Sequence, residues 1–479
     1  MLSAKLITPK KINELHLKQT ALGVILVAFF LTLFSGISRA QDNSPYSRYG
    51  IGDLVPSTNI NTRAMGGISS AYSDIFSINF NNPASYSFFQ AVKESKSRKL
   101  VSGRAILDVG LNFENRTLQE PDNPLKFTAS NALFSHMQVG IPLRKNWGLS
   151  FGLRPVSRIS YKIAKLERLS DPITGDPIDS AYTEYNGDGG SYLASVGTGF
   201  TIFKKENQGV ETQNLSIGFN TGYFFGKKDY STKRTLLNDT VEYYRANFQT
   251  RTNYGNIYFN AGLQYKILLS ERKRQYLTIG ANGNWSQTLN ATQDIIRTTF
   301  VSDPSQGDVQ LDSVRILGDI KGDIVFPASL TVGIMYEKLP QVKEAGWMIG
   351  VDFSQTKWDD YRFYGVKELV ADKWELRIGT QLRPVPGRNY FSNVAYRAGF
   401  FTGPDYIKAA GDIKQTGITL GLGLPVSISR QAPNQATFVN LAFEYIKRGD
   451  NDDLLKESLF RISLGFSLSD IWFIKRKYD

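Results

Sequence analysis

Residues 215–225, LSIGFNTGYFF, decide the fold. Apolar side chains hold alternate positions, at Leu215, Ile217, Phe219, Tyr223 and Phe225. The positions between them are small or polar, at Ser216, Gly218, Asn220 and Gly222. Because alternate side chains of a β-strand point to opposite faces of its sheet, this stretch predicts a strand with one apolar face and one small, polar face.

The same alternation recurs from about residue 103 to the end of the chain. It predicts fourteen strands, near residues 103–113, 128–141, 146–160, 189–203, 213–227, 253–268, 275–290, 324–337, 345–357, 372–383, 393–402, 414–427, 436–447 and 458–469. Strands of about ten residues or more can cross a membrane at a tilt, and the polar face suits a lumen. We therefore predict an all-β fold, a transmembrane antiparallel β-barrel of about fourteen strands over residues 103–470. The alternative, a soluble β-sandwich, needs a second apolar inner face, which these segments lack.

The breaks between these strands alternate in length. Long breaks at 114–127, 161–188, 228–252 and 291–323 alternate with short ones at 142–145, 204–212, 269–274 and 338–344. Outer-membrane barrels have short periplasmic turns and long external loops. An even number of strands also puts both ends of the barrel on one side of the membrane. We therefore expect both ends in the periplasm and every long break outside.

The composition excludes several kinds of site. The 479 residues include no Cys and only 2 His, which excludes disulfides, thiolate metal sites and cysteine nucleophiles. The formal charge of +12 would suit nucleic acid, but the basic residues lie in a leader, in loops and in turns, and form no stripe with aromatic residues. We predict no nucleic-acid partner, no metal and no cofactor. A mean hydropathy of −0.26 fits a barrel, whose strands alternate apolar and polar side chains.

The first forty residues have the features of a secretory signal peptide. A basic stretch ending at Lys18 precedes an apolar run at residues 21–34, and the small residues Ser38 and Ala40 stand before Gln41. The alternative, a membrane anchor, needs about 20 apolar residues, more than this run has. We predict cleavage between Ala40 and Gln41 and a mature protein in the bacterial outer membrane.

Residues 41–102 differ in character from the predicted strands. They contain the motif Met65-Gly66-Gly67 and, further on, Asn81-Asn82-Pro83-Ala84. The two glycines permit positive φ in a tight turn, and Pro83 pushes Asn82 toward extended geometry. In this order the motifs resemble the N-terminal signature of FadL-type outer-membrane barrels, which include hydrophobic-compound transporters and the related type IX secretion shuttle barrel.

The resemblance implies a fourteen-stranded barrel whose N-terminal segment, here residues 41–102, folds into the lumen as a hatch. It makes the residues of both motifs candidates for a ligand gate: Met65, Gly66, Gly67, Asn81, Asn82, Pro83 and Ala84. A gate that moves on ligand binding and a static plug are both compatible with these residues. Two features depart from the transporters: the opening YSRYG at residues 46–50, and a basic tail at 471–479, which we expect in the periplasm.

Catalytic candidates are few. His136 is the one histidine outside the leader, and its alternation with Met137 turns it toward the lumen. No GxSxG motif accompanies it, so we interpret His136 as a structural hydrogen-bonding residue and predict no enzyme. Phe224 and Met348 are predicted to face the lumen as apolar contacts.

Two functions follow as hypotheses. The first, implied by the resemblance, is passage of hydrophobic small molecules, fatty-acid-like or aromatic, across the outer membrane. The second is a non-transporting barrel subunit of a complex for protein secretion or β-barrel assembly, with the tail and long loops as docking surfaces. Outer-membrane lipid and lipopolysaccharide are expected partners in both cases. An apolar pocket leading to the wall would favour the first, and a lumen filled by polar side chains the second.

Overall fold

The computed structural model describes residues 44–93, 100–121, 123–237, 244–303, 305, 307–408, 411–426 and 435–472. The predicted signal peptide, with its cleavage site between Ala40 and Gln41, lies outside these residues, as does the tail from residue 473. No helix among the described residues is long and apolar enough to cross a membrane.

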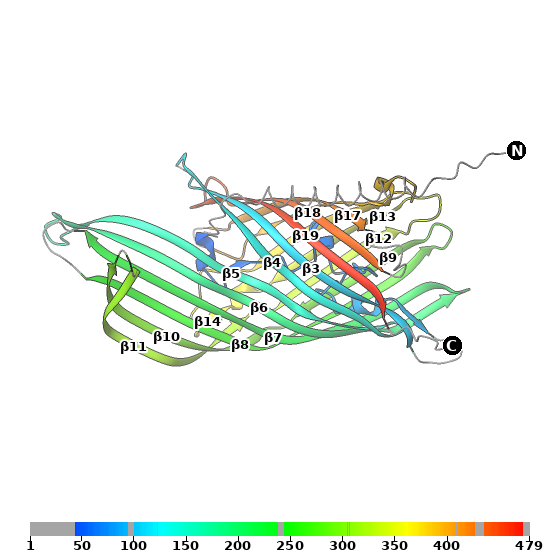
Figure 1. Cartoon of the computed structure of the whole chain (residues 1–479), viewed down its shortest axis with the longest axis horizontal. Coiled ribbons are helices and arrows are strands. Elements are labelled where there is room, and N and C mark those ends of the chain that lie inside the picture. Colours follow the sequence, from blue (N-terminus) through cyan, green and yellow to red (C-terminus); the bar gives the residue numbers. More distant parts are fainter. Residues whose placement is uncertain are drawn as a thin grey trace, which may run out of the picture. The chain divides into compact units, whose positions relative to one another are not determined.

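The described chain forms one antiparallel sheet that closes on itself, because the last strand pairs with the first strand of the wall (Figure 1). Its wall strands are β3 (Leu100–Gln119), β4 (Lys126–Arg144), β5 (Trp147–Ser170), β6 (Pro177–Asn207), β7 (Val210–Leu237), β8 (Arg245–Ser270), β9 (Gln275–Asn284), β10 (Gln287–Asp303), β11 (Gly307–Phe326), β12 (Ser329–Lys338), β13 (Gly346–Thr356), β15 (Lys373–Arg383), β16 (Ala395–Pro404), β17 (Lys414–Val426), β18 (Ala436–Arg448) and β19 (Lys456–Trp472). The shorter elements are η1 (Pro45–Arg48), β1 (Asp53–Leu54), α2 (Ile60–Arg63), η2 (Pro83–Phe88), β2 (Ala91–Lys93), η3 (Trp358–Asp360), β14 (Arg362–Phe363) and η4 (Tyr390–Asn393).

Two of the wall strands are interrupted. β9 and β10 both pair with β8 and together make one strand, and β11 and β12 make the next. The interruption between β11 and β12 contains Pro327, which has no N–H to donate to a ladder. Counted in this way, the described residues form a barrel of fourteen strands, which confirms the predicted fold class and strand number.

The outward face of the wall is apolar across neighbouring strands. Phe460 pairs with Tyr445, Tyr445 with Ile418, and Ile418 with Phe400. All four side chains are exposed. We call these four residues the apolar row, since they form the kind of surface that faces acyl chains in an outer-membrane barrel.

The long breaks were predicted incorrectly as loops. β5 continues to Ser170 and β6 begins at Pro177, and β10 and β11 pair as far as Asp303 and Gly307. These segments are therefore paired ribbons. In Figure 1 the ribbons extend well past β18 and β19. Their strands stay paired although the apolar alternation has ended, because the backbone ladder continues, for example where Lys162 lies opposite Asn186. The half-exposed Lys162 ammonium also lies 3.0 Å from Glu184. We call the end of the barrel that carries these ribbons the outer end.

The N-terminal segment, residues 44–93, lies against the inner wall of the barrel (Figure 1). Inward-facing glycines make room for its backbone. A Cβ on Gly199 would lie 2.1 Å from the Pro83 carbonyl oxygen, and one on Gly379 2.2 Å from that of Met65. The small side chains on the inner face of the strands therefore allow the N-terminal segment to pack against the wall, in addition to lining the lumen.

The wall is split between β4 and β5 at the outer end. The two strands pair only where residues 137–144 meet residues 147–153. Above that point β5 pairs instead with β1, where Asp53 and Leu54 lie opposite Arg158 and Ser157. The diverging strands are visible in Figure 1.

Candidate functional site

A cavity of about 290 Å³ lies between the N-terminal segment and the wall. Five of its residues form an aromatic and aliphatic side: Leu193, Phe224, Tyr258, Phe326 and Trp358. The Phe224 and Phe326 ring centroids are 5.0 Å apart, and those of Phe326 and Trp358 are 6.0 Å apart. Phe224 is only 1% exposed and faces inward, where the sequence analysis placed it. This side of the cavity could hold a small apolar group.

The outer side of the cavity is charged. Arg448 contacts three carboxylates, with its Nη1 3.0 Å from Asp53 and 3.2 Å from Glu457, and its Nε on Asp405. Arg116 Nη1 lies 2.9 Å from the same Glu457 carboxylate, and its Nη2 lies 2.5 Å from Asp53. We call these five residues the outer ion network.

The outer ion network fixes the N-terminal segment to the wall. Burial alone would raise the pKa of the Asp53 carboxyl, but Arg116 and Arg448 outweigh burial and hold that pKa well below its usual range. The Ser44 hydroxyl donates a 2.6 Å hydrogen bond to Glu457, and the Tyr46 ring lies 4.7 Å from the Arg448 guanidinium carbon. The opening motif YSRYG is thus held where β3 and β18 end and β19 begins.

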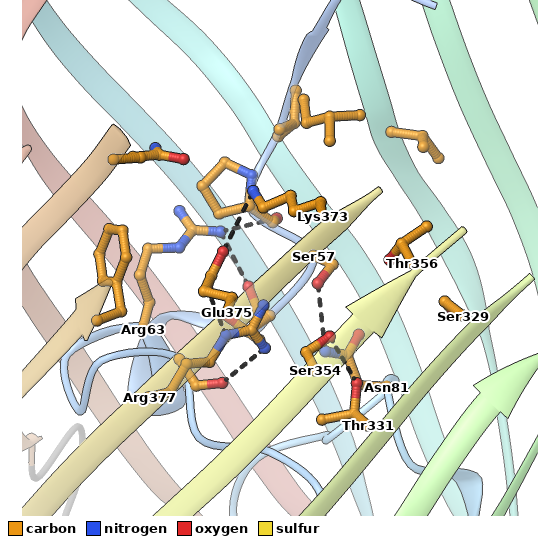
Figure 2. Close-up of a pocket in the computed structure, with 18 of the residues that line it drawn as sticks. Ser57, Arg63, Asn81, Ser329, Thr331, Ser354, Thr356, Lys373, Glu375 and Arg377 are labelled. Carbon is orange, nitrogen blue, oxygen red and sulfur yellow. Dashed lines mark hydrogen bonds and ion pairs between the residues drawn. The ribbon is translucent and has the colours of Figure 1, made fainter. Parts of the chain in front are cut away.

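Two further charged groups face the cavity. Arg461 lies 2.6 Å from Glu114 and 3.2 Å from Glu444, and all three are buried. On β15, Lys373, Glu375 and Arg377 occupy alternate positions and point the same way, as Figure 2 shows. Glu375 is 3.2 Å from Lys373 and 2.5 Å from Arg377.

Arg63, at the end of α2, is a second anchor of the N-terminal segment. Its guanidinium donates to Asn112, Ser135 and Ser463 on three wall strands. It also donates to the Pro56 and Thr58 carbonyl oxygens of its own segment, and it lines the same cavity as Lys373 and Glu375 (Figure 2). Arg63 is 2% exposed.

The Met65-Gly66-Gly67 motif forms a turn against β15 and β16. Gly66 has a φ of 67° and Gly67 a φ of 85°, and the Gly66 N–H donates to the Thr419 hydroxyl over 2.9 Å. Met65 is fully buried in a cluster with Met335 and Met348. Met348 therefore faces inward, but it packs on the N-terminal segment and does not line the cavity.

Gly66→Ala is expected to lower the free energy of unfolding by about 2–3 kcal/mol, because the new Cβ meets unyielding backbone. That Cβ would lie 2.7 Å from the Ile378 oxygen and 2.8 Å from the Phe400 oxygen. Gly67→Ala is the matched control, since its Cβ finds only the Arg377 side chain at 3.5 Å. Thermal unfolding, followed by the gel mobility of the folded barrel, compares the two. Equal losses would contradict the close approach at Gly66.

The Asn81-Asn82-Pro83-Ala84 motif begins η2. The Asn82 side chain accepts a 3.1 Å hydrogen bond from the Ala84 N–H and donates to the Ser70 and Leu263 carbonyl oxygens. Asn81 lines the cavity and accepts at its carbonyl from the Asn260 amide. Both motifs therefore tie the segment to itself and to the wall, and the structure brings Gly66, Gly67 and Asn81 to the cavity.

His136 is fully buried between β3 and the N-terminal segment. Its Nε2 lies 3.4 Å from Asp108, its Nδ1 lies 3.2 Å from the Ser135 hydroxyl, and its ring centroid lies 5.2 Å from that of Phe80. Sequence reasoning missed both polar partners. His136, Asp108 and Ser135 do not line the cavity, and the Ser135 hydroxyl already accepts a hydrogen bond from Arg63. These residues therefore have the contacts of a structural hydrogen-bonding group. No cluster of His, Asp and Glu suited to a metal ion is found within the described residues.

The charged residues of the cavity were also missed by the sequence analysis. A signal for them exists: Glu114 and Arg116, Glu444 and Arg448, and Glu457 and Arg461 are spaced by two or four residues. Such spacing puts both members of each pair on the inward face of one strand. Opposite charges repeated at this spacing on neighbouring strands predict buried ion pairs.

Comparison with known proteins places the chain in a family. A model of the BamG family matches residues 21–479. The chain belongs to the BamG family. This BamG-family barrel is similar to the solved structure of a Pseudomonas aeruginosa FadL homologue, with 12% identity, a TM-score of 0.47, and 88% of this chain and 100% of that one covered. It is also similar to the Pseudomonas putida toluene transporter TodX, with 14% identity, a TM-score of 0.45, and coverage of 88% and 99%. The CymD monoaromatic hydrocarbon channel shows 13% identity, a TM-score of 0.45, and coverage of 88% and 98%.

A search of curated proteins finds no match to this BamG-family chain. The predicted resemblance to FadL-type barrels is confirmed at the level of the fold alone, as a fourteen-strand antiparallel barrel.

Proposed function

We propose that this barrel is a closed, non-transporting subunit of an outer-membrane complex for protein secretion or β-barrel assembly. The observation that supports it is the filling of the lumen by the N-terminal segment and by buried ion pairs. A hydrophobic molecule that moved from the aromatic side of the cavity toward the outer end would meet Arg116, Arg448 and Glu457. Taking water or charged partners away from such groups costs several kcal/mol each, which opposes passage of an apolar solute.

The outer end supports the same proposal. Large apolar side chains stand exposed on the ribbons, among them Leu166 (67%), Ile173 (92%) and Val314 (70%). Exposed apolar side chains such as these are available for contacts with a partner protein. The family model that matches nearly the whole chain is BamG, whereas the solved channels share only 12–14% identity with it.

The test has two measurements on the full chain in its native outer membrane. Gentle purification of the tagged protein is expected to bring down other membrane proteins in fixed stoichiometry. Depletion of the protein is expected to reduce the folded, heat-modifiable forms of unrelated barrels or the proteins secreted across the membrane. If depletion leaves both unchanged and lowers only the uptake of hydrophobic compounds, the subunit function is wrong.

The second candidate is passage of fatty-acid-like or aromatic compounds. The split between β4 and β5 favours it, because that split lies in the wall beside Arg154 and Val156, which line the cavity. A tightly retained apolar ligand in the purified protein, with no stoichiometric partner, would support this candidate against the first.

The organisation expected from the sequence forms part of the proposal. Residues 1–40 are a leader removed after Ala40, residues 41–102 an N-terminal hatch segment, and residues 471–479 a periplasmic tail. Membrane lipid covers the apolar row, with lipopolysaccharide around the outer end. Mass spectrometry of the mature N-terminus tests the first of these boundaries.

A further inference from the structure

A second cavity, of about 190 Å³, lies at the end of the barrel opposite the outer end. We call it the inner cavity. It is lined by the N-terminal segment, by the turn that joins β12 to β13 and by the turn that joins β15 to β16. Its apolar wall consists of Phe76, Pro340, Pro384, Pro386 and Phe438. The Phe76 and Phe438 ring centroids are 4.9 Å apart. A cavity of roughly 150 Å³ holds a benzene ring, so the inner cavity has room for one apolar side chain.

Arg397 is a buried cation in the wall of the inner cavity, only 6% exposed. Its Nε donates a 2.8 Å hydrogen bond to Gln381, and its Nη1 donates a 3.0 Å hydrogen bond to Asn440. Both acceptors are uncharged, and within the described chain no carboxylate forms an ion pair with Arg397. Burying a cation without an anion is costly, so this position favours an anionic partner.

Among the described residues, the one carboxylate that lines the inner cavity belongs to Asp74, and it does not balance Arg397. The Asp74 carboxylate lies 3.8 Å from the Arg383 guanidinium, and it accepts hydrogen bonds from the Tyr72 hydroxyl over 2.9 Å and from the Phe76 N–H over 3.1 Å. The charges of Asp74 and Arg383 offset each other. The lining therefore keeps one positive charge, at Arg397.

Asn61, in α2, brings an unpaired acceptor to the same cavity. It is 5% exposed, and its Oδ1 has no hydrogen-bond partner among the described residues. A buried carbonyl oxygen of this kind requires an N–H or O–H donor. The inner cavity thus combines a cation without an anion, an acceptor without a donor, and an apolar wall.

This combination distinguishes between possible occupants. Water donates to Asn61 but leaves Arg397 without an anion. An inorganic anion neutralises Arg397 but leaves Asn61 without a donor and the apolar wall uncovered. An ionised fatty-acid-like or aromatic acid covers the wall and neutralises Arg397, but it carries no hydrogen-bond donor. The last residue of a polypeptide supplies all three groups, because an N–H and a side chain flank its carboxylate.

We propose that the inner cavity binds the carboxyl-terminal residue of another polypeptide when the side chain of that residue is apolar. Its carboxylate accepts from Arg397, its N–H donates to Asn61 Oδ1, and its side chain packs on Phe76 and Phe438. Capture of a terminal carboxylate is a recurring mode of peptide recognition. This inference rests on the proposed subunit function and names the substrate class, which is unfolded chains that reach the inner end with a free carboxyl terminus.

The experiment measures binding of a fluorescent pentapeptide to the purified full-length barrel by fluorescence anisotropy. The peptide consists of glycine and serine, with phenylalanine as its last residue and a free carboxylate. We expect saturable binding, and a loss of affinity of about tenfold or more when the carboxylate is amidated or the last residue is glycine. Phenylpropanoic acid has the same carboxylate and ring but no N–H, and it should compete only weakly.

Variants of the barrel test the two polar contacts. Arg397→Gln should lower the affinity for the peptide about tenfold or more, because it removes the cation. Arg388→Gln is the matched control, since Arg388 is exposed in the turn between β15 and β16 and does not line the cavity. Asn61→Leu should weaken binding of the peptide and leave binding of phenylpropanoic acid unchanged. Gel mobility of the folded barrel reports on each variant.

A folded parent barrel that does not bind the peptide would overturn the inference, and so would an Arg397→Gln barrel that binds it as tightly as the parent. Phenylpropanoic acid that binds as tightly as the peptide would also overturn it, because the cavity would then take a small amphiphilic acid. If the peptide fails to bind but purification recovers a stoichiometric complex, the subunit function stands and only the role of the cavity is wrong. If the peptide binds as expected but depletion affects neither other barrels nor secreted proteins, the binding site stands and the subunit function is wrong.

Discussion

Arg448→Ala is expected to lower the free energy of unfolding of the barrel by about 3–5 kcal/mol, because it leaves buried carboxylates without their cation. Arg448 contacts Asp53, Asp405 and Glu457, and each of these is more than half removed from solvent. Arg116 still reaches Asp53 and Glu457 in the variant, whereas Asp405 loses its contact with the Arg448 guanidinium. Thermal unfolding in detergent, followed by gel mobility, measures the loss.

Lys367→Ala is the matched control. The Lys367 ammonium lies 3.2 Å from Asp359, but both side chains are more than half exposed. An exposed ion pair of this kind contributes about 0–1 kcal/mol, so this variant should unfold close to the parent. Arg448→Lys should recover only part of the stability, because an ammonium cannot reproduce the fork that the guanidinium presents to three carboxylates. Similar unfolding temperatures for Arg448→Ala and Lys367→Ala would show that the outer ion network does not hold the barrel.

The alternation of side chains predicted the membrane-spanning parts of the wall strands accurately. It predicted the parts that extend beyond the membrane poorly. The strand expected at 436–447 is Ala436–Arg448, because lipid on one side and lumen on the other force a period of two. The strand expected at 189–203 is Pro177–Asn207, since its outer part lies beyond the membrane, where no apolar alternation is required. Only the pairing partner, Arg234 opposite Thr183 for example, shows that this part is a strand.

The residues of the candidate site were likewise predicted only in part. Gly66 and Asn82 were found because their roles are local: a positive φ, and a cap on the following turn. The outer ion network was not found because its members come together only in the closed barrel. Asp53 and Arg448 are 395 residues apart in the chain. Without knowledge of which strands pair, the sequence gives no reason to expect a contact between them.

The second large effect is expected at Arg63. Arg63→Ala should lower the free energy of unfolding by about 3–4 kcal/mol, because several buried acceptors lose their donor together. The Arg63 guanidinium donates over 2.6 Å to Asn112, over 3.1 Å to Ser135 and over 3.3 Å to Ser463, which lie on β3, β4 and β19. Its remaining bonds hold the chain before α2, at the Pro56 and Thr58 carbonyl oxygens.

Because Arg63 joins the N-terminal segment to three wall strands, its loss should also loosen that segment inside the lumen. Ion current through single barrels in a planar bilayer measures this directly, and the parent is expected to be closed while Arg63→Ala shows intermittent opening. Arg383→Ala is the control, since Arg383 is 40% exposed and lies 3.8 Å from Asp74 of the same segment. Arg63→Lys should open as well, because all five acceptors are uncharged oxygens placed for a planar fork rather than for a point charge. Currents in Arg63→Ala no different from those in Arg383→Ala would mean that the segment is held by the outer ion network alone, and that its inner contacts with the wall contribute little to closure.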